Sequence, residues 1–240
     1  MNISQKSLSE FKLVVVGAGF FGLTIAELYS RHLNRPVLVI DKRDHVGGNA
    51  WSEIDQQTGI EYHKYGSHIF HTNNLEVWSY INNFTKFNDY IHHVWSVHQS
   101  QLYSMPINLH SISQFYGKYM SPVHAKEFLD TRKNLLQSAR DNSFETKAIQ
   151  SVGKDLYESF FKNYTFKQWG TDPKNLPKET FTRLPVRYNL DSRYFSDKYQ
   201  GIPQDGYHTV FKNMLVNPKI KVQLDLDFDL IKDQVPSDAL

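Results

Sequence analysis

The sequence contains no cysteine. A disulfide framework and a thiolate metal site are therefore both excluded, which is typical of proteins that work in a reducing cytoplasm. An excess of one charge is also absent, because 27 basic and 25 acidic residues leave a net charge of only +2. A field this weak gives no reason to expect nucleic acid as a partner.

Long apolar runs are missing as well. Residues 1–10 hold no apolar core of signal-peptide length, and no stretch approaches the roughly 18 apolar residues of a membrane span. We therefore expect a soluble, cytoplasmic protein with no membrane partner. Aromatic residues are abundant, with 14 Tyr and 16 Phe, and they suit a packed core and a ring-stacking surface equally well.

The most informative stretch is a valine-rich run that leads into a glycine turn. Val14-Val-Val precedes the fingerprint Gly17-Ala-Gly19-Phe-Phe-Gly22, and a helical pattern and a second apolar run follow. This order predicts a βαβ unit that binds a dinucleotide. The glycines allow a sharp turn, a close approach of the backbone to the pyrophosphate, and tight packing of the helix, whose N-terminus faces the phosphates.

An acidic residue and a second glycine pair narrow the choice of ligand. Asp41 ends the second apolar run, where a carboxylate accepts hydrogen bonds from ribose hydroxyls and repels the 2′-phosphate of NADP. Gly47-Gly48-Asn49 then offers a second close approach of backbone to ligand, which a plain NAD domain does not need. Together the two glycine clusters indicate an FAD-binding domain of the glutathione-reductase or amine-oxidase type.

The rest of the chain alternates between helical and strand-like patterns. A capping box between Asn73 and Glu76 is expected to open the first helix after the fingerprint unit. The predicted helices run from this cap to about Asn83, from Ser121-Pro122 to about Ala139, over 144–152, over 154–165, and from Gly206 to about Val216. The predicted strands form a hairpin within 87–105, occupy 181–199, and run from Lys219 to Leu226 as a return to the nucleotide-binding sheet.

These elements predict an α/β fold. We expect a Rossmann-like FAD-binding domain with a parallel sheet, an inserted mainly helical domain, and a small antiparallel sheet. The expected divisions are an FAD-binding part at 1–86, an antiparallel excursion at 87–106, a helical substrate domain at 107–170, a strand-rich substrate segment at 171–204, and an incomplete return to the FAD-binding domain at 205–240.

Six segments, in collinear order between about residues 11 and 228, resemble the bacterial UDP-galactopyranose mutases. The histidine box and the Lys-Gln-Trp-Gly box are far more specific than the glycine fingerprint. The segments are Val16–Gly22, Asp41–Ala50, His63–His71, Tyr164–Gly170, Arg183–Arg187 and Gly201–Tyr207.

The resemblance implies an isomerase, an intramolecular transferase that interconverts UDP-galactopyranose and UDP-galactofuranose for cell-surface polysaccharide synthesis. Its cofactor is FAD in the reduced form, which bonds to the sugar while UDP leaves, without net oxidation. It also implies that His68 and Arg183 are catalytic, His68 beside the flavin and Arg183 on the leaving diphosphate. The implied cofactor-binding residues are Gly17, Gly19, Phe20, Phe21, Gly22, Asp41, Lys42, Gly48, Asn49, His63, His68, His71 and Val222.

The implied substrate pocket consists of aromatic residues for the uridine and polar residues for the diphosphate. For Phe160 and Phe161, a place in the core at helical spacing is an equally good interpretation. The implied substrate-binding residues are Phe160, Phe161, Tyr164, Thr165, Trp169, Arg183 and Tyr194.

A metal site is the alternative for the histidine segment, since His63, His68 and His71 offer three imidazoles. None of these three is spaced i, i+4, and Glu61 is the only nearby carboxylate. We therefore predict no metal.

The sequence departs from the family pattern at its C-terminal end. The family pattern continues with a second phosphate-binding arginine and with partner tyrosines, and residues 229–240 resemble none of it. We therefore expect a truncated chain that is inactive alone, and a homodimer or a complementary C-terminal fragment as its protein partner. The alternatives are a flavin oxidoreductase of the amine-oxidase type, for which the Lys167-Gln-Trp169 box has no evident use, and a non-catalytic FAD- or UDP-sugar-binding fragment of a split enzyme.

Overall fold

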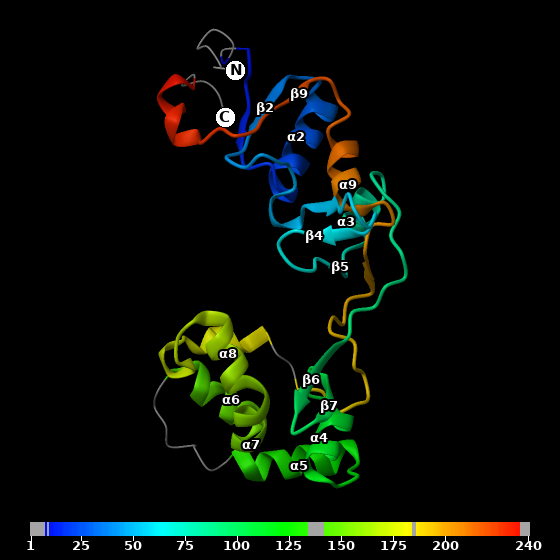
Figure 1. Ribbon diagram of the computed structural model, residues 1–240, viewed down its shortest axis with the longest axis vertical. Coiled ribbons are helices and arrows are strands. Elements are labelled where there is room, and N and C mark those ends of the chain that lie inside the picture. The colour runs from blue at the N-terminus through cyan, green and yellow to red at the C-terminus, as the bar shows by residue number, and fades with distance from the viewer. Residues whose placement is uncertain (1–7, 9, 134–141, 184–185, 236–240) are drawn as a thin grey trace. The chain divides into compact units, whose positions relative to one another are not determined.

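The computed structural model describes residues 8, 10–133, 142–183 and 186–235, except the side chains of Thr182 and Arg183. The chain forms two compact units (Figure 1). The first unit comprises Met1–Tyr90 and Asp197–Leu240, and the second comprises Ile91–Ser196. Within the described residues, no helix has both the length and the apolar character that crossing a membrane requires.

A parallel sheet is the centre of the first unit. It contains β1 (Val14–Val16), β2 (Val37–Ile40) and β9 (Ile220–Gln223) in the order β1-β2-β9. Strand β2 is buried along its whole length, as expected for a central strand of a parallel sheet that reads as a continuous apolar run. The predicted βαβ unit and the predicted return of the chain to this sheet are confirmed.

Helix α2 (Phe20–Leu33) connects β1 to β2 and depends on two glycines. Gly17 turns the chain out of β1 with a φ of +104°, a conformation that glycine adopts without strain. Gly22 lies where a Cβ atom would come within 1.9 Å of the carbonyl oxygen of Gly17. The helix can therefore approach the strand only because residue 22 has no side chain.

The remaining elements of the first unit pack around this βαβ unit. Rings from α9, Tyr207 and Phe211, are fully buried and form one cluster with Leu23 and Ala26 of α2. The elements are the 3-10 turn η1 (Gly48–Ala50), the hairpin of β3 (Ser52–Ile54) and β4 (Glu61–His63), the pair of β5 (Phe70–Thr72) and β8 (Tyr199–Gly201), the helices α3 (Leu75–Ile81) and α9 (Gly206–Met214), and the 3-10 turns η6 (Phe228–Leu230) and η7 (Lys232–Gln234).

Helix α3 differs from its prediction at both ends. Its cap is Asn74, whose side chain accepts hydrogen bonds from the backbone N–H groups of Glu76 and Val77. The predicted capping box between Asn73 and Glu76 is therefore one residue out of register, because the Asn73 amide instead donates to Asp197 at 2.6 Å. The helix ends at Ile81, and the side chains of the following asparagines bond its last carbonyls.

The second unit joins a hairpin to a group of helices. The predicted hairpin is confirmed, with a turn at Gln99 and Ser100 that has positive φ at both residues. The elements are β6 (Val94–His98), β7 (Gln101–Met105), α4 (Leu109–Tyr116), α5 (Pro122–Lys133), α6 (Phe144–Val152), α7 (Lys154–Leu156), the π-turn η3 (Tyr157–Phe161), α8 (Lys162–Trp169), and the 3-10 turns η4 (Pro173–Asn175) and η5 (Lys178–Arg183).

Helices α5 and α6 of this unit were predicted, and α4 was not. Helix α6 has the predicted bounds, whereas the predicted end of α5 near Ala139 lies outside the described residues. Helix α4 was not predicted, although Asn108 and Ser111 form a complete capping box at its start.

The strands predicted over 181–199 are absent from the described part of that segment. Residues 186–198 form bends and irregular loop, with a single bridge between His93 and Arg193, and strand β8 begins only at Tyr199. The apolar and polar alternation was misleading because the guanidinium of Arg187 bonds backbone carbonyls of this loop. These carbonyls therefore have partners without a neighbouring strand.

Replacing Gly22 with alanine is expected to lower the free energy of unfolding by about 1–3 kcal/mol, because the added methyl overlaps the Gly17 carbonyl. Gly19→Ala is the matched control, since its Cβ would meet nothing nearer than the Cα of Gly48 at 4.0 Å. As Gly19 only caps α2, this variant should lose less than about 1 kcal/mol. Urea unfolding followed by circular dichroism measures both, and equal losses would contradict the packing argument.

Candidate functional site

The carboxyl ends of the three parallel strands meet at a cavity of about 550 Å³. Ligands of open α/β sheets bind at this edge. The cavity is lined by Val16, Gly17, Gly19, Ile40, Asp41, Lys42, Arg43, Gly48 and Asn49, and by Leu226, Asp227, Phe228 and Asp229.

The two glycine clusters form one side of this cavity together. The backbone N–H of Gly47 donates to the carbonyl of Ala18 at 2.7 Å. A Cβ atom on Gly48 would lie only 3.3 Å from the Cα of Gly19. Gly47 has a positive φ, and a Cβ atom added there would lie only 2.3 Å from the ring of Phe211. Only glycine allows the two loops to lie this close.

Asp41 braces the first glycine loop from the end of β2. Its carboxylate accepts the backbone N–H of Ala18 at 2.7 Å and that of Arg43 at 2.9 Å. A carboxylate has about four acceptor positions, so these two bonds leave room for ribose hydroxyls. The structure thus gives Asp41 a second task that its sequence position did not reveal, which is to hold the fingerprint loop in place.

Arg43 also faces the cavity, although the motif analysis assigned it no role. Its Nη2 donates to the Asn49 side chain at 2.8 Å, and its guanidinium lies 4.7 Å from the ring centroid of Tyr65. Its Nη1 is buried and has no hydrogen-bond partner among the described residues. An unsatisfied buried donor costs about 1–3 kcal/mol, so this atom is available to a polar or anionic ligand.

The segment after β9 forms the opposite rim of the cavity, and none of its residues was predicted as a site residue. Leu226 N–H bonds the carbonyl of Asp41 at 3.0 Å, and Asp225 N–H bonds that of Arg43 at 3.0 Å. The available signal was topological, because a third parallel strand must end at the same edge as the first two. The glycine cradle, the anchored Asp41 carboxylate and the Arg43 Nη1, which has no hydrogen-bond partner among the described residues, together fit the ribose and phosphates of a dinucleotide.

Several predicted cofactor residues do not line the cavity. The ring of Phe20 packs 4.7 Å from that of Phe211 in the core, whereas Phe21 is 82% exposed on α2. Gly22 serves the packing of α2, and Val222 pairs with Val39 within the sheet. For Phe20, Gly22 and Val222 the fold itself gives a reason for the residue type.

The predicted histidines lie on the strands and loop next to α9, each with its own partner. His63 Nδ1 accepts the backbone N–H of His68 at 2.8 Å, so the proton of its neutral ring is on Nε2. His68 Nδ1 bonds the carbonyl of Gly66 at 2.8 Å, which requires the proton on Nδ1. His71 Nδ1 lies 2.7 Å from a carboxylate oxygen of Asp197.

The three imidazoles therefore differ in their hydrogen-bond partners. Burial lowers the pKa of His63, opposed by the charge of Glu61, and the ring is therefore neutral near pH 7. His63 and His68 have ring centroids 6.3 Å apart. Among the described residues, no group of three or more His, Asp or Glu side chains is arranged to hold a metal ion.

The predicted substrate residues occur in the second unit, mostly along one helical stretch. Phe160 and Phe161 are each 6% exposed and pack in its core against Tyr103 and Phe181. The π-turn at 157–161 allows these adjacent rings to be buried together. Their burial favours the core interpretation.

The same helix presents other rings to the surface. Tyr164 and Trp169 are 64% and 56% exposed, whereas Thr165 between them is buried. The helix ends at Trp169 because Gly170 adopts a left-handed φ of 64°. Phe166 is also 56% exposed, so three large rings are exposed within five residues of sequence, as a base-stacking surface requires.

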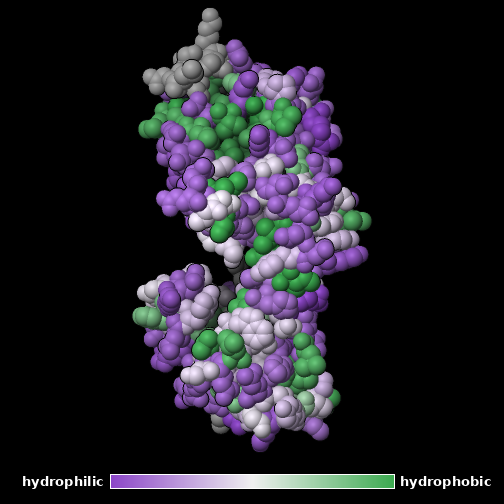
Figure 2. Space-filling view, turned by 45° about the vertical axis from the view of Figure 1, so that its right-hand side comes forward, coloured by the Kyte–Doolittle hydropathy of each residue, from purple (hydrophilic) through white to green (hydrophobic). Residues whose placement is uncertain are grey.

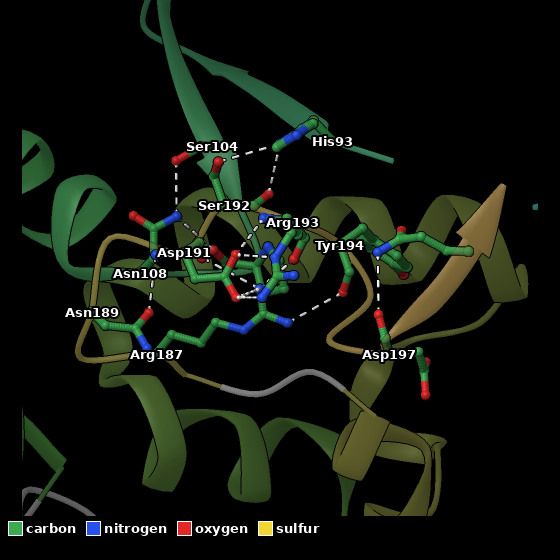
Figure 3. Close-up of polar contacts among 12 residues, drawn as sticks. His93, Ser104, Asn108, Arg187, Asn189, Asp191, Ser192, Arg193, Tyr194 and Asp197 are labelled. Atoms are coloured by element: carbon green, nitrogen blue, oxygen red, sulfur yellow. Dashed lines mark hydrogen bonds and ion pairs between the residues drawn. The ribbon is translucent and has the colours of Figure 1, made fainter. Parts of the chain in front are cut away.

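The residues predicted to bind phosphate lie further along the chain. The side chain of Arg183 is outside the described part of the structure. Tyr194 lies in the loop of Figure 3, where its backbone N–H bonds the carbonyl of His92 at 2.7 Å. In the same loop, the guanidinium of Arg193 bonds Asp191 and lowers the pKa of that carboxyl to about 2.

Comparison with known proteins gives two family matches. The model of the UDP-galactopyranose mutase family matches residues 159–239, and that of the NAD(P)-binding Rossmann-like domain matches residues 15–84. The chain is 44% identical over 214 residues to a dTDP-fucopyranose mutase of Escherichia coli, covering 89% of this chain and 56% of that protein. It is 41% identical over 216 residues to a probable UDP-galactopyranose mutase of Klebsiella pneumoniae, covering 90% and 56%.

Among solved structures, a reduced UDP-galactopyranose mutase matches with a TM-score of 0.66 at 18% identity, over 89% of this chain and 48% of that chain. This likeness shows the fold. The chain spans about half the length of the curated relatives it matches.

Acidification below the ordinary histidine pKa of about 6.5 is expected to destabilise the first unit. The lowered pKa of His63 means that the folded protein binds this proton more weakly than the unfolded chain. Stability is therefore full above about pH 6.5 and is lost as the pH falls towards the lowered value. Urea midpoints measured on either side of this value test the effect.

The control is His63→Asn, whose amide oxygen accepts the His68 N–H but does not titrate. Its stability should depend less on pH than that of the wild type. An identical pH dependence in both proteins would contradict the assignment to His63.

Proposed function

We propose that this chain, which is 44% identical to a dTDP-fucopyranose mutase and 41% identical to a probable UDP-galactopyranose mutase, provides the FAD site and the nucleotide surface of a sugar-nucleotide mutase. The reaction is the interconversion of UDP-galactopyranose and UDP-galactofuranose. The relatives continue beyond the matched half, and the proposed reaction belongs to a protein of their length.

The observation that carries the proposal is the contact between the two glycine loops at the sheet edge. Gly47 N–H bonds Ala18, and Gly48 lies against Gly19, so one surface formed by both loops faces the cavity. A plain NAD site needs only the first loop. These loops would hold FAD in its reduced form, which would supply an electron pair to the sugar without net oxidation.

In this proposal each end of the cofactor has its own residues. Asp41 holds the ribose, while the backbone N–H groups of α2 and the unpartnered Nη1 of Arg43 hold phosphate oxygens. His68 belongs beside the reacting end of the flavin. Its Nδ1 donates to the carbonyl of Gly66, which leaves Nε2 as the ring atom that can hold or take a proton.

The substrate half of the proposal rests on the second unit and on the resemblance. Trp169 and Tyr164 offer exposed rings to the uracil. Arg183 stabilises the charge that develops on the leaving diphosphate, and Tyr194 donates a hydrogen bond to the same group. Phe160, Phe161 and Thr165 support this surface from beneath.

A second candidate substrate is the dTDP-fucopyranose pair, favoured by the 44% identity to the Escherichia coli protein of that name. Both candidates interconvert the six-membered and five-membered ring forms of a sugar on a pyrimidine nucleoside diphosphate, and the described contacts do not distinguish uracil from thymine. A cytoplasmic location and a role in surface polysaccharide synthesis form part of the proposal.

The edge of strand β1 is the reason to propose a protein partner. This strand pairs with β2 on one side only within the described residues, and its last residue, Val16, is 58% exposed. Apolar patches also interrupt the hydrophilic surface in Figure 2. An unpaired strand edge accepts another strand, either from a complementary fragment or from a second copy of the chain.

Gly19→Ala is expected to lower FAD affinity by at least about tenfold, because its methyl would enter the gap between the two glycine loops. The loss should occur in a protein that still folds. Flavin retained after purification and equilibrium dialysis of the apoprotein with FAD provide the measurement. Wild-type FAD affinity in this variant would contradict the placement of the FAD phosphates at the gap between the two glycine loops.

The function itself is tested with the chemically reduced protein, UDP-galactofuranose and the dTDP-linked fucofuranose. Binding is expected from the chain itself, and conversion to the pyranose from a protein of its relatives' full length. In a separate sample with oxidised flavin, substrate-dependent reduction of that flavin would favour the oxidoreductase. Binding without conversion at full length would favour a nucleotide-sugar binder, and failure to bind either sugar nucleotide would overturn the proposal.

A further inference from the structure

The loop from Arg187 to Tyr194 is fixed at three points within the second unit. Arg187 N–H bonds the carbonyl of Ile107 at 2.9 Å, and Asn189 accepts the N–H of Leu109 at 3.0 Å. At the far end, Tyr194 N–H bonds His92 at 2.7 Å. Both flanks of the β6–β7 hairpin thus hold the ends of a loop that forms no strand ladder of its own.

The guanidinium of Arg187 fills the centre of this loop (Figure 3). Its Nη1 donates to the carbonyls of Asp191, at 3.3 Å, and of Arg193, and its Nη2 donates to the carbonyl of Tyr194 at 3.4 Å. The side chain is only 10% exposed. One planar group therefore replaces the sheet partner that these carbonyls would otherwise need.

A carboxylate of the loop partly offsets the charge of this buried group. A carboxylate oxygen of Asp191 lies 3.9 Å from Arg187 Nη1, and the same carboxylate is bound by Arg193 through Nε and Nη2, each at 2.9 Å. The hydrogen bonds from Arg193 lower the pKa of Asp191 to about 2, so this carboxyl is ionised under ordinary conditions.

Tyr194 is the residue that this arrangement holds in place. Its carbonyl is bound by Arg187 and its N–H by His92, while its ring packs 4.9 Å from Phe195 and 5.5 Å from His92. Both backbone groups of Tyr194 thus have partners, and two neighbouring rings contact its ring. Such constraint is what a side chain needs to donate to a ligand in one geometry.

We propose that Arg187 is a positioning residue that fixes Tyr194 for contact with the substrate diphosphate. The inference rests on the proposed function, which assigns that contact to Tyr194. Arg187 does not touch the ligand in this account, and its bonds go to the loop carbonyls. A lysine keeps the charge but lacks the planar fork, so it cannot serve the same three carbonyls.

The first test is hydrogen exchange of the full chain, followed by mass spectrometry. Arg187→Lys should increase exchange in peptides covering 189–195. The matched control is Arg132→Lys, which alters another guanidinium of the same unit, one that lies over the rings of Tyr116 and Phe128 and pairs with Asp155. Unchanged exchange at 189–195 in Arg187→Lys, or an equal increase in the control, overturns the assignment.

The second test is a double-mutant cycle in UDP affinity, measured by titration calorimetry. Arg187→Lys and Tyr194→Phe should each weaken UDP binding by about tenfold. The double variant should bind no more weakly than Tyr194→Phe alone, because Arg187 acts through the tyrosine. A merely structural role would instead give additive losses and would also appear in Arg132→Lys.

The outcomes separate this inference from the function on which it rests. Absence of UDP binding by the wild-type chain overturns the proposed function and, with it, the diphosphate role of Tyr194. Normal UDP binding by Arg187→Lys, or additive losses in the cycle, overturns the positioning role alone.

Discussion

The hydrogen bond between Gly47 N–H and the carbonyl of Ala18 is the contact on which the candidate site depends. It joins the fingerprint loop after β1 to the second glycine loop after β2. Asp41 secures the same loop from a third direction through the N–H of Ala18. Both polar groups of residue 18 are therefore used to shape the cradle. The cradle is consequently held by its own hydrogen bonds, and the ligand meets backbone N–H groups together with the side chains of Asp41 and Arg43.

The second unit solves a similar problem with a side chain. The loop that carries Tyr194 lacks a strand partner, and the guanidinium of Arg187 bonds its carbonyls instead. The π-turn at 157–161 buries the adjacent residues Phe160 and Phe161. The helix that follows it exposes Tyr164 and Trp169 and is thus anchored in the core at its start. In both units the groups proposed to meet a ligand rest on elements that are fixed from behind.

The sequence predicted those parts whose cause is local. The glycine fingerprint and the valine-rich strands each carry their own signal, and the first βαβ unit follows from them. Tertiary contacts decided the rest. The alternation over 181–199 predicted strands, but the donors that satisfy the loop come from one arginine. The cavity-facing role of Arg43 depends on Asn49 and Tyr65, and this contact has no counterpart in local periodicity.

The central claim is that the two glycine loops form one site for a flavin dinucleotide. Titration of the flavin-free chain with FAD, FMN and NADH, followed by ligand fluorescence, tests it most directly. The account predicts saturable binding of FAD to one site, with FMN and NADH binding more weakly by at least about tenfold, because only FAD combines the dinucleotide phosphates and the flavin that the two loops accommodate. Preferential binding of NADH, or no saturable binding of FAD, would contradict it.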